Sequence, residues 1–160
     1  MDPVVAAVVD MLRTNAAELR AVAQGLDAGA LNQPPAPDSS SIAVLVAHAA
    51  TATVALGTAA LTGSFDVLRY RAEERVPAFA VSAATSDDLT PYLNRLDQFI
   101  DHLASQGDTL AGRWGEPVQV DADPGDPPTS RAWRLIHAVE HLREHVGHAQ
   151  LTRQIVEAPE

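Results

Sequence analysis

Apolar residues recur every three or four positions in two well-separated stretches of the chain, which is the spacing of one face of an α-helix. The first stretch predicts a helix over residues 3–23, and the second predicts a helix over 86–105. Pro3 and Ser86 fit the starts of these helices, because proline is tolerated in a first turn and serine is a good N-cap. The apolar positions are Val5, Val8, Val9, Leu12, Ala16, Leu19 and Ala23 in the first stretch, and Leu89, Leu93, Leu96, Phe99, Ile100 and Leu103 in the second.

A third stretch, residues 40–62, is apolar on nearly every side. Between Asp38 and Asp66 there is no Asp, Glu, Lys or Arg, and His48 is the only ionisable side chain. A membrane span would have this composition, but four threonines and a mid-segment histidine argue against one. We therefore expect a helix buried inside a soluble protein.

A fourth helix is predicted over residues 129–156, and proline- and glycine-rich segments separate the four helices. Residues 26–38 predict a loop, and residues 63–85 are irregular, with a short helical piece at 65–75. Within the long connection 106–128, WGEPVQV suggests an extended piece and DADPGDPP suggests turns. The pattern predicts an all-α protein, a four-helix bundle that forms a single domain over residues 1–160.

The composition narrows the function classes further. The chain has no cysteine, which excludes disulfides, cysteine nucleophiles and cysteine metal ligands. Its net charge of −10 and its lack of lysine give it no basic face, so we expect no nucleic-acid partner. Asp2 stands where an export signal carries basic residues, and Asp10 interrupts the N-terminal apolar run, which argues against such a signal. We expect a cytoplasmic protein with no membrane partner.

Four of the six histidines lie within twelve residues of the last predicted helix. On a helical wheel, His137, His141, His145 and His148 form one sector. That sector lies beside the core face, which comprises Leu135, Ala138, Val139, Leu142, Val146 and Ala149. His145 lies nearest the apolar edge. The histidines should therefore line a cleft between two helices.

His141 and His145 are four residues apart, so their side chains are neighbours on the helix surface. Two such imidazoles can bind one divalent cation, and His48 is the natural third ligand from the uncharged helix. Three histidine ligands leave a coordination position open for water or substrate. Each histidine also has a simpler interpretation: His48 as a hydrogen-bonded core residue, and the others as polar edge residues. We interpret His102 as a surface or structural residue.

One known metal motif nearly fits this helix, and a second one does not occur in it. Residues 141–145 match His-x-x-Glu-His, a zinc-protease pattern in which Glu144 would be the base. Such enzymes need a further ligand well downstream, and only a short segment follows His145. We therefore expect Glu144 to be a solvated charge. Its alternative role is that of a base or a hydrogen-bond acceptor beside the histidines. The Glu-x-x-His pairs of di-iron bundles are absent.

The segment SSSIAVLVAHAA around His48 and the segment HLREHVGHAQLTRQ from His141 resemble the DinB-like superfamily. This superfamily includes bacterial thiol-dependent transferases and the metal-binding domain of the mycothiol-dependent maleylpyruvate isomerase. The resemblance implies a four-helix bundle, often a homodimer, in which His48, His141 and His145 bind nickel or zinc. The metal would activate a low-molecular-weight thiol, such as mycothiol or bacillithiol, toward a small-molecule electrophile.

The sequence departs from the family pattern at His148, where many members have glutamine. His137 and His148 are therefore candidates for a pocket or second-shell role around the metal. Two functions stay open: a metal-dependent thiol S-transferase, or a non-enzymatic bundle that binds a metal or a small ligand. A purely structural bundle is a third interpretation of the same residues.

Overall fold

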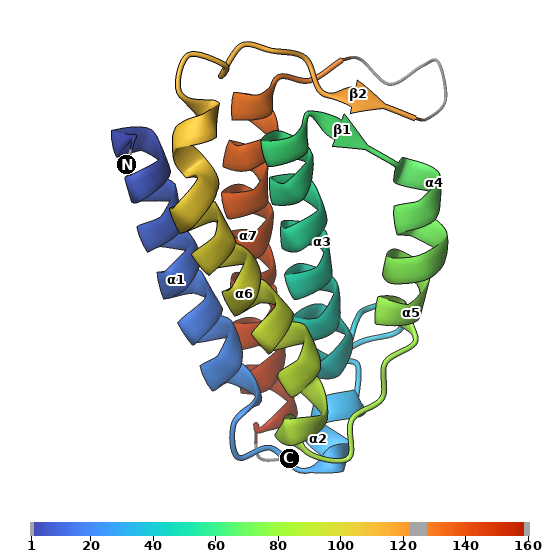
Figure 1. The fold of residues 1–160 in the computed structure, drawn as a ribbon. Coiled ribbons are helices and arrows are strands. Elements are labelled where there is room, and N and C mark those ends of the chain that lie inside the picture. Colours follow the sequence, from blue (N-terminus) through green and yellow to red (C-terminus); the bar gives the residue numbers. More distant parts are fainter. Residues whose placement is uncertain (1, 122–127, 159–160) are drawn as a thin grey trace.

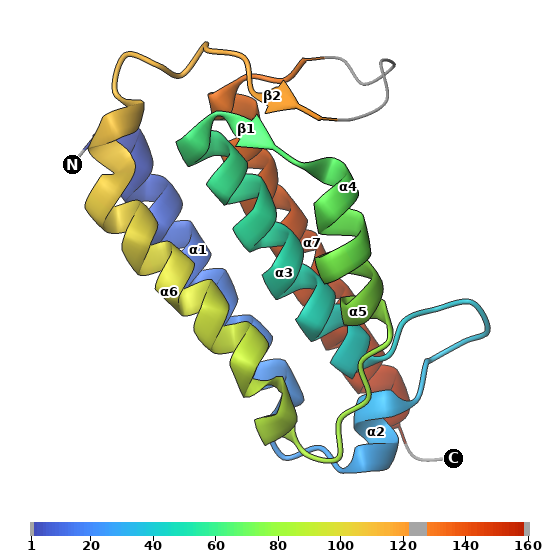
Figure 2. The same ribbon diagram turned by 45° about the vertical axis from the view of Figure 1, so that its right-hand side comes forward.

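The computed structural model describes residues 2–121 and 128–158, and its long helices form a bundle. The four long helices are α1 (Pro3–Ala23), α3 (Ile42–Thr62), α6 (Thr90–Gln106) and α7 (Arg131–Val156). In Figures 1 and 2, α1 and α6 form one layer, and α3 and α7 form the other. The predicted all-α four-helix bundle is therefore confirmed.

Helix α3 is the most enclosed element of the bundle, as its lack of charge predicts. It packs against both α7 and α6, and Ile42, Ala43, Val46 and Ala47 have no exposed surface. Among the described residues, α3 alone is long and apolar enough to cross a membrane, but 83% of its most apolar window is buried. That burial is typical of the core helix of a soluble protein. Gly57 allows close packing, because a Cβ there would lie 2.1 Å from the Phe99 ring.

Side-chain caps define the starts of three long helices, where the first backbone N–H groups have no partner within the helix. The caps are Asp2 for α1, Ser41 for α3 and Ser130 for α7. The expected N-cap at Ser86 is wrong. Ser86–Leu89 forms a 3₁₀ turn (η2) ahead of α6, and the Asp88 carboxylate accepts a hydrogen bond from the Thr85 N–H at 2.9 Å.

The connections contain more helix than the sequence predicts. Within the predicted loop 26–38, Ala28–Asn32 forms α2, capped by Asp27. After α3 the chain forms an arm of three helical pieces that packs on α3: α4 (Val67–Arg69), a π-helical turn η1 (Tyr70–Arg75) and α5 (Val76–Phe79). Pro77 lies directly after the π-helical turn, inside a run of helical residues that is continuous from Val67 to Phe79.

The remaining connection crosses one end of the bundle. Gly107–Leu110 forms a 3₁₀ turn (η3), and β1 (Ser64–Phe65) pairs in parallel with β2 (Gln119–Val120), so part of the predicted extended piece is a short strand. Most of the DADPGDPP segment predicted as turns lies outside the described residues.

Two arginines at opposite ends of α7 cap the C-termini of two neighbouring helices. Arg131 is buried and donates from Nη1 to the Ala60 and Leu61 carbonyls, each at 2.7 Å, at the end of α3. Arg153 donates from Nη1 to the Val22 and Gln24 carbonyls, each at 3.0 Å, at the end of α1. The two guanidinium groups satisfy carbonyls that a helix leaves unpaired, and they fix where α7 lies along both neighbours.

Candidate metal centre

Three histidines from two helices converge between α3 and α7. His48 lies near the middle of α3, and His141 and His145 lie one turn apart on α7. The apolar face of α7 sets this orientation, because Leu142 and Val146 are fully buried and turn the adjacent histidines toward α3. The structure therefore brings together the three residues that the sequence singles out.

The distances among the three rings suit a shared cation. One ligand nitrogen from each histidine lies within 4.8 Å of the other two. The Nε2 atoms of His141 and His145 are 3.3 Å apart. Two nitrogens bound to one tetrahedral ion at about 2.0–2.1 Å would be separated by about 3.3 Å. The pair on α7 therefore already has the spacing of two ligands.

The electrostatic environment keeps these imidazoles neutral. Burial, followed by the charges of His145 and Arg75, lowers the pKa of His48 to about 4. Burial and the neighbouring histidines lower the pKa of His141 to about 3, and burial also lowers the pKa of His145. A metal binds the neutral form of histidine, so all three rings can offer lone pairs at neutral pH.

Buried polar atoms without partners also mark this cluster. The Nδ1 atoms of His48, His141 and His145 are all buried, and none has a hydrogen-bond partner among the described residues. A buried polar atom left unpaired costs about 1–3 kcal/mol. Three such atoms in one cluster are unusual for a purely structural core. A cation between the Nε2 atoms of His141 and His145 would leave the Nδ1 atoms of both rings unpaired, so the case for a cation rests on the convergence of the three rings. The donor set and its geometry fit a divalent ion such as zinc or nickel.

Phe79 of the arm covers His48, a contact that sequence reasoning missed. The two ring centroids are 4.5 Å apart, and the Arg75 guanidinium lies 4.9 Å from the Phe79 ring centroid. No motif marks either residue, because the arm falls in the segment expected to be irregular. Only the presence of aromatic and basic residues in that segment could have drawn attention to it.

The other two histidines of α7 lie on either side of the triad. His137 is half-buried, stacks near Trp133 with centroids 4.6 Å apart, and has its Nδ1 atom 3.2 Å from the Glu140 carboxylate. His148 is exposed, and its ring centroid lies 5.7 Å from that of His145. The two histidines therefore lie on either side of the triad. Their predicted role, to line the pocket or to support the ligands, stays a prediction.

Two further candidates lie outside the cluster of rings. Glu144 is exposed, and within the described residues it makes no hydrogen bond or ion pair, although its charge counteracts the lowering of the His145 pKa. His102 is exposed on α6. Both positions agree with the simpler interpretation of each residue as a solvated side chain.

A pocket of about 330 Å³ opens beside the triad at His145 and His148. The α2–α3 connection supplies polar groups to its wall, and α3 and α7 supply apolar ones. The lining residues include Ser39, Ser40, Leu45, Leu151 and Ile155. A small molecule in this pocket would have one end at the imidazoles and the other against aliphatic side chains.

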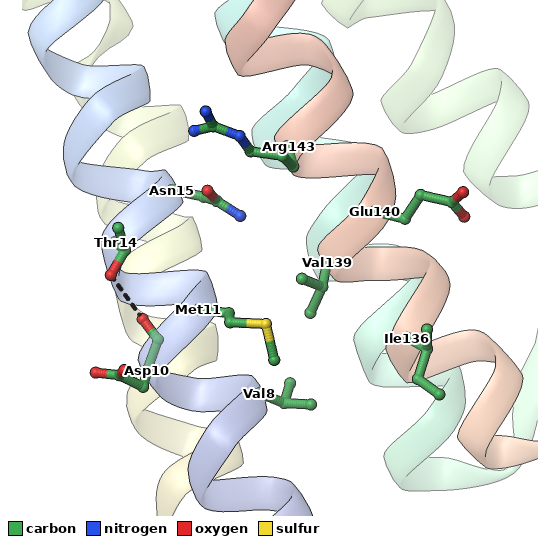
Figure 3. Close-up of a pocket in the computed structure, with 9 residues that line it drawn as sticks. All are labelled: Val8, Asp10, Met11, Thr14, Asn15, Ile136, Val139, Glu140 and Arg143. Carbon is green, nitrogen blue, oxygen red and sulfur yellow. Dashed lines mark hydrogen bonds between the residues drawn. The ribbon is translucent and has the colours of Figure 1, made fainter.

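A larger groove of about 490 Å³ lies on the opposite side of α7, against α1. In Figure 3, Val8 and Met11 of α1 point toward Val139 of α7 across this groove. Its lining is mostly apolar, and its polar members are largely engaged elsewhere: Arg143 pairs with Glu18, and Thr14 donates to the Asp10 carbonyl. The groove brings together no set of groups comparable with the histidine triad.

Comparison with protein families gives a match over nearly the whole chain. The family model described as mycothiol-S-transferase matches residues 7–158. The chain belongs to the mycothiol-S-transferase family. This assignment confirms the resemblance to the DinB-like superfamily and supports a thiol-using, transferase-like protein at the level of the family.

A solved structure from Enterococcus faecalis, described as a conserved protein, has the same fold. It is 20% identical to this chain, the alignment covers 98% of each chain, and the TM-score is 0.73. At that identity the likeness extends to the fold alone. No curated protein matches the chain.

Proposed function

We propose that this protein is a divalent-metal-dependent thiol S-transferase. His48, His141 and His145 hold nickel or zinc, and a low-molecular-weight thiol, mycothiol or bacillithiol, is the cosubstrate. The observation that carries the proposal is the convergence of three neutral imidazoles in a member of the mycothiol-S-transferase family that has no cysteine. Because the chain has no thiol of its own, the nucleophilic sulfur must come from a bound molecule.

Each part of the site has a defined task in this proposal. When bound, the ion supplies positive charge that favours the thiolate form of a coordinated thiol, which is the nucleophilic form. The three imidazoles hold the ion and leave coordination positions open, while Phe79 shields His48 from solvent. The pocket beside His148 gives small molecules access to the histidines, and the carbon of the electrophile receives the sulfur as the leaving group departs. The thiol proton passes to solvent.

The decisive experiment combines metal analysis with turnover on protein that carries no histidine tag. We expect about one nickel or zinc ion per chain, and mycothiol-dependent or bacillithiol-dependent conjugation of monochlorobimane. His141→Ala should lose both the metal and the activity, whereas His102→Ala, an exposed histidine on α6, should keep both. Metal binding without turnover for either thiol would instead support a non-enzymatic metal-binding protein.

The absence of bound metal, with no change in melting temperature on adding zinc or nickel, would contradict the proposed site and support a structural bundle. We also propose that the protein acts in the cytoplasm, where small thiols are kept reduced, and that it forms a homodimer. Size-exclusion chromatography with light scattering tests the homodimer.

A further inference from the structure

A basic residue that makes no ion pair within residues 2–121 and 128–158 lies next to the histidine triad. Arg75 ends the π-helical turn η1, and its guanidinium carbon lies 4.9 Å from the centroid of the Phe79 ring. The same ring lies 4.5 Å from the ring of His48. A single phenyl ring therefore separates the guanidinium from a proposed metal ligand.

The ion pairs of the arm explain why Arg75 is available. Its neighbour Glu74 is almost buried and is already engaged, with Arg69 at 3.3 Å and Arg95 of α6 at 2.6 Å. Within the described part of the chain, Arg75 has no ion pair, although acidic residues outnumber basic ones by 21 to 11. In a strongly acidic protein, an arginine held beside the proposed site without a carboxylate is suited to an anion from outside.

The backbone around Arg75 is also unusual. The arm changes from α-helix to a π-helical turn over Tyr70–Arg75 and returns to α-helix at Val76. Such turns are rare and are found frequently at functional sites. The Glu74–Arg95 ion pair anchors this turn to α6, and Arg75 and Phe79 are left exposed at the edge of the site.

We propose that Arg75 binds a carboxylate on the electrophilic substrate and so makes the transferase selective for acidic electrophiles. This inference rests on the proposed function. The guanidinium would form charge-assisted hydrogen bonds with the carboxylate, while the electrophilic carbon lies several bonds away beside the histidines. With 4-(chloromethyl)benzoate, a carbon–sulfur bond would form at the benzylic carbon as the carbon–chlorine bond breaks. Chloride would leave with the bonding electrons, and the thiol proton would go to solvent.

The test compares two electrophiles of the same shape, 4-(chloromethyl)benzoate, which is charged, and 4-(chloromethyl)benzamide, which is neutral, with the metal-loaded protein and mycothiol. Because the chain has no cysteine, alkylation of a protein thiol cannot obscure the measurement. Arg75→Ala should lower kcat/KM for the benzoate by about 10-fold and leave kcat/KM for the benzamide unchanged. Arg75→Lys should fall between wild type and Arg75→Ala. Arg71→Ala removes another exposed arginine of the same turn and should change neither rate.

Binding of 4-(chloromethyl)benzoate without thiol, followed by saturation-transfer NMR, separates a failure of the anion site from a failure of the proposed reaction. If binding depends on Arg75 but no thiol is transferred, the anion site stands and the proposed reaction is wrong. If wild type and Arg75→Ala bind the benzoate equally, the anion site is wrong, whatever the rate of transfer. Equal losses for both electrophiles in Arg75→Ala would also overturn it, because they would indicate a structural role.

Discussion

The two flanks of α7 show how little cavity size says about chemistry. The flank facing α1 has the larger cavity, about 490 Å³, with a mostly apolar lining. The flank facing α3 has a pocket of about 330 Å³, but it brings three neutral imidazoles together and buries a nitrogen of each without a partner. Apolar packing explains the first flank fully. The second flank brings three imidazoles together in a way that packing leaves unexplained, and a bound cation would account for that convergence.

The largest contrast between the flanks should come from removing one ligand. His145→Ala should weaken zinc binding by at least ~100-fold, because loss of a ligand exceeds the effect of losing a supporting hydrogen bond. Val139→Ala changes the opposite flank of the same helix and should leave zinc affinity unchanged. Competition with a chromophoric chelator measures both. Similar affinities in the two variants would mean that His145 is not a ligand.

The two capping arginines allow the flanks to be compared for stability. Arg131→Ala should lower the free energy of unfolding by about 2–3 kcal/mol, since it removes charged hydrogen bonds to buried carbonyls at the end of α3. Arg153→Ala should cost about 1 kcal/mol, because this side chain is 29% exposed and water can replace it. Urea denaturation measures both losses. A larger loss for Arg153→Ala would contradict the view that α7 is held more firmly to α3 than to α1.

Acid should weaken the histidine flank of the metal-free protein. The pKa of His48 is lowered to about 4 and that of His141 to about 3, whereas unfolded histidines titrate near about 6.5. Between these values the unfolded chain binds more protons. The stability contributed by the neutral rings is therefore complete above about pH 6.5 and decreases as the pH falls.

Urea denaturation at about pH 7.5 and pH 5 checks this dependence. His141→Phe cannot bind the extra proton and should lose less stability on acidification than wild type. The carboxylates titrate alike in both proteins, so the difference between the two losses isolates the ring. Equal losses would show that His141 has an ordinary pKa in the folded chain.

The smallest effect is expected on the apolar flank. Ile136 is 59% exposed beside the α1–α7 groove, so Ile136→Gln should change the free energy of unfolding by no more than about 0.5 kcal/mol. It should also leave zinc affinity and thiol transfer unchanged. A thermal melt and the chelator assay test both statements. A loss of activity would show that the groove takes part in function.

Sequence periodicity predicts the bundle well, because each long helix carries its own apolar face. The stripe on α7 and the isolated His48 also predict a cluster of rings, and the resemblance to a known family singles out His141 and His145 within the stripe. The arm over His48 could not be predicted in the same way. Its π-helical turn and the stacking of Phe79 depend on contacts with α3 and on the Glu74–Arg95 pair, which joins residues from different helices.

Dependence on neighbouring contacts also explains why the predicted N-cap at Ser86 is wrong. Ser86 satisfies the local rules for an N-cap, but the chain begins a 3₁₀ turn there, and the Asp88 carboxylate binds the Thr85 N–H one residue earlier. Single-residue preferences do not settle a choice between adjacent caps. The hydrogen bonds of the surrounding turn decide it.

The two arginine caps also limit where residues can be inserted into or deleted from α7. Arg131 and Arg153 hold α7 to different neighbours at positions about 33 Å apart along one continuous helix. Inserting one residue between them would rotate the following turns by about 100° and move one arginine off its carbonyls. Homologues should therefore gain and lose residues in the connection before Arg131, and keep the number of residues between the two caps constant.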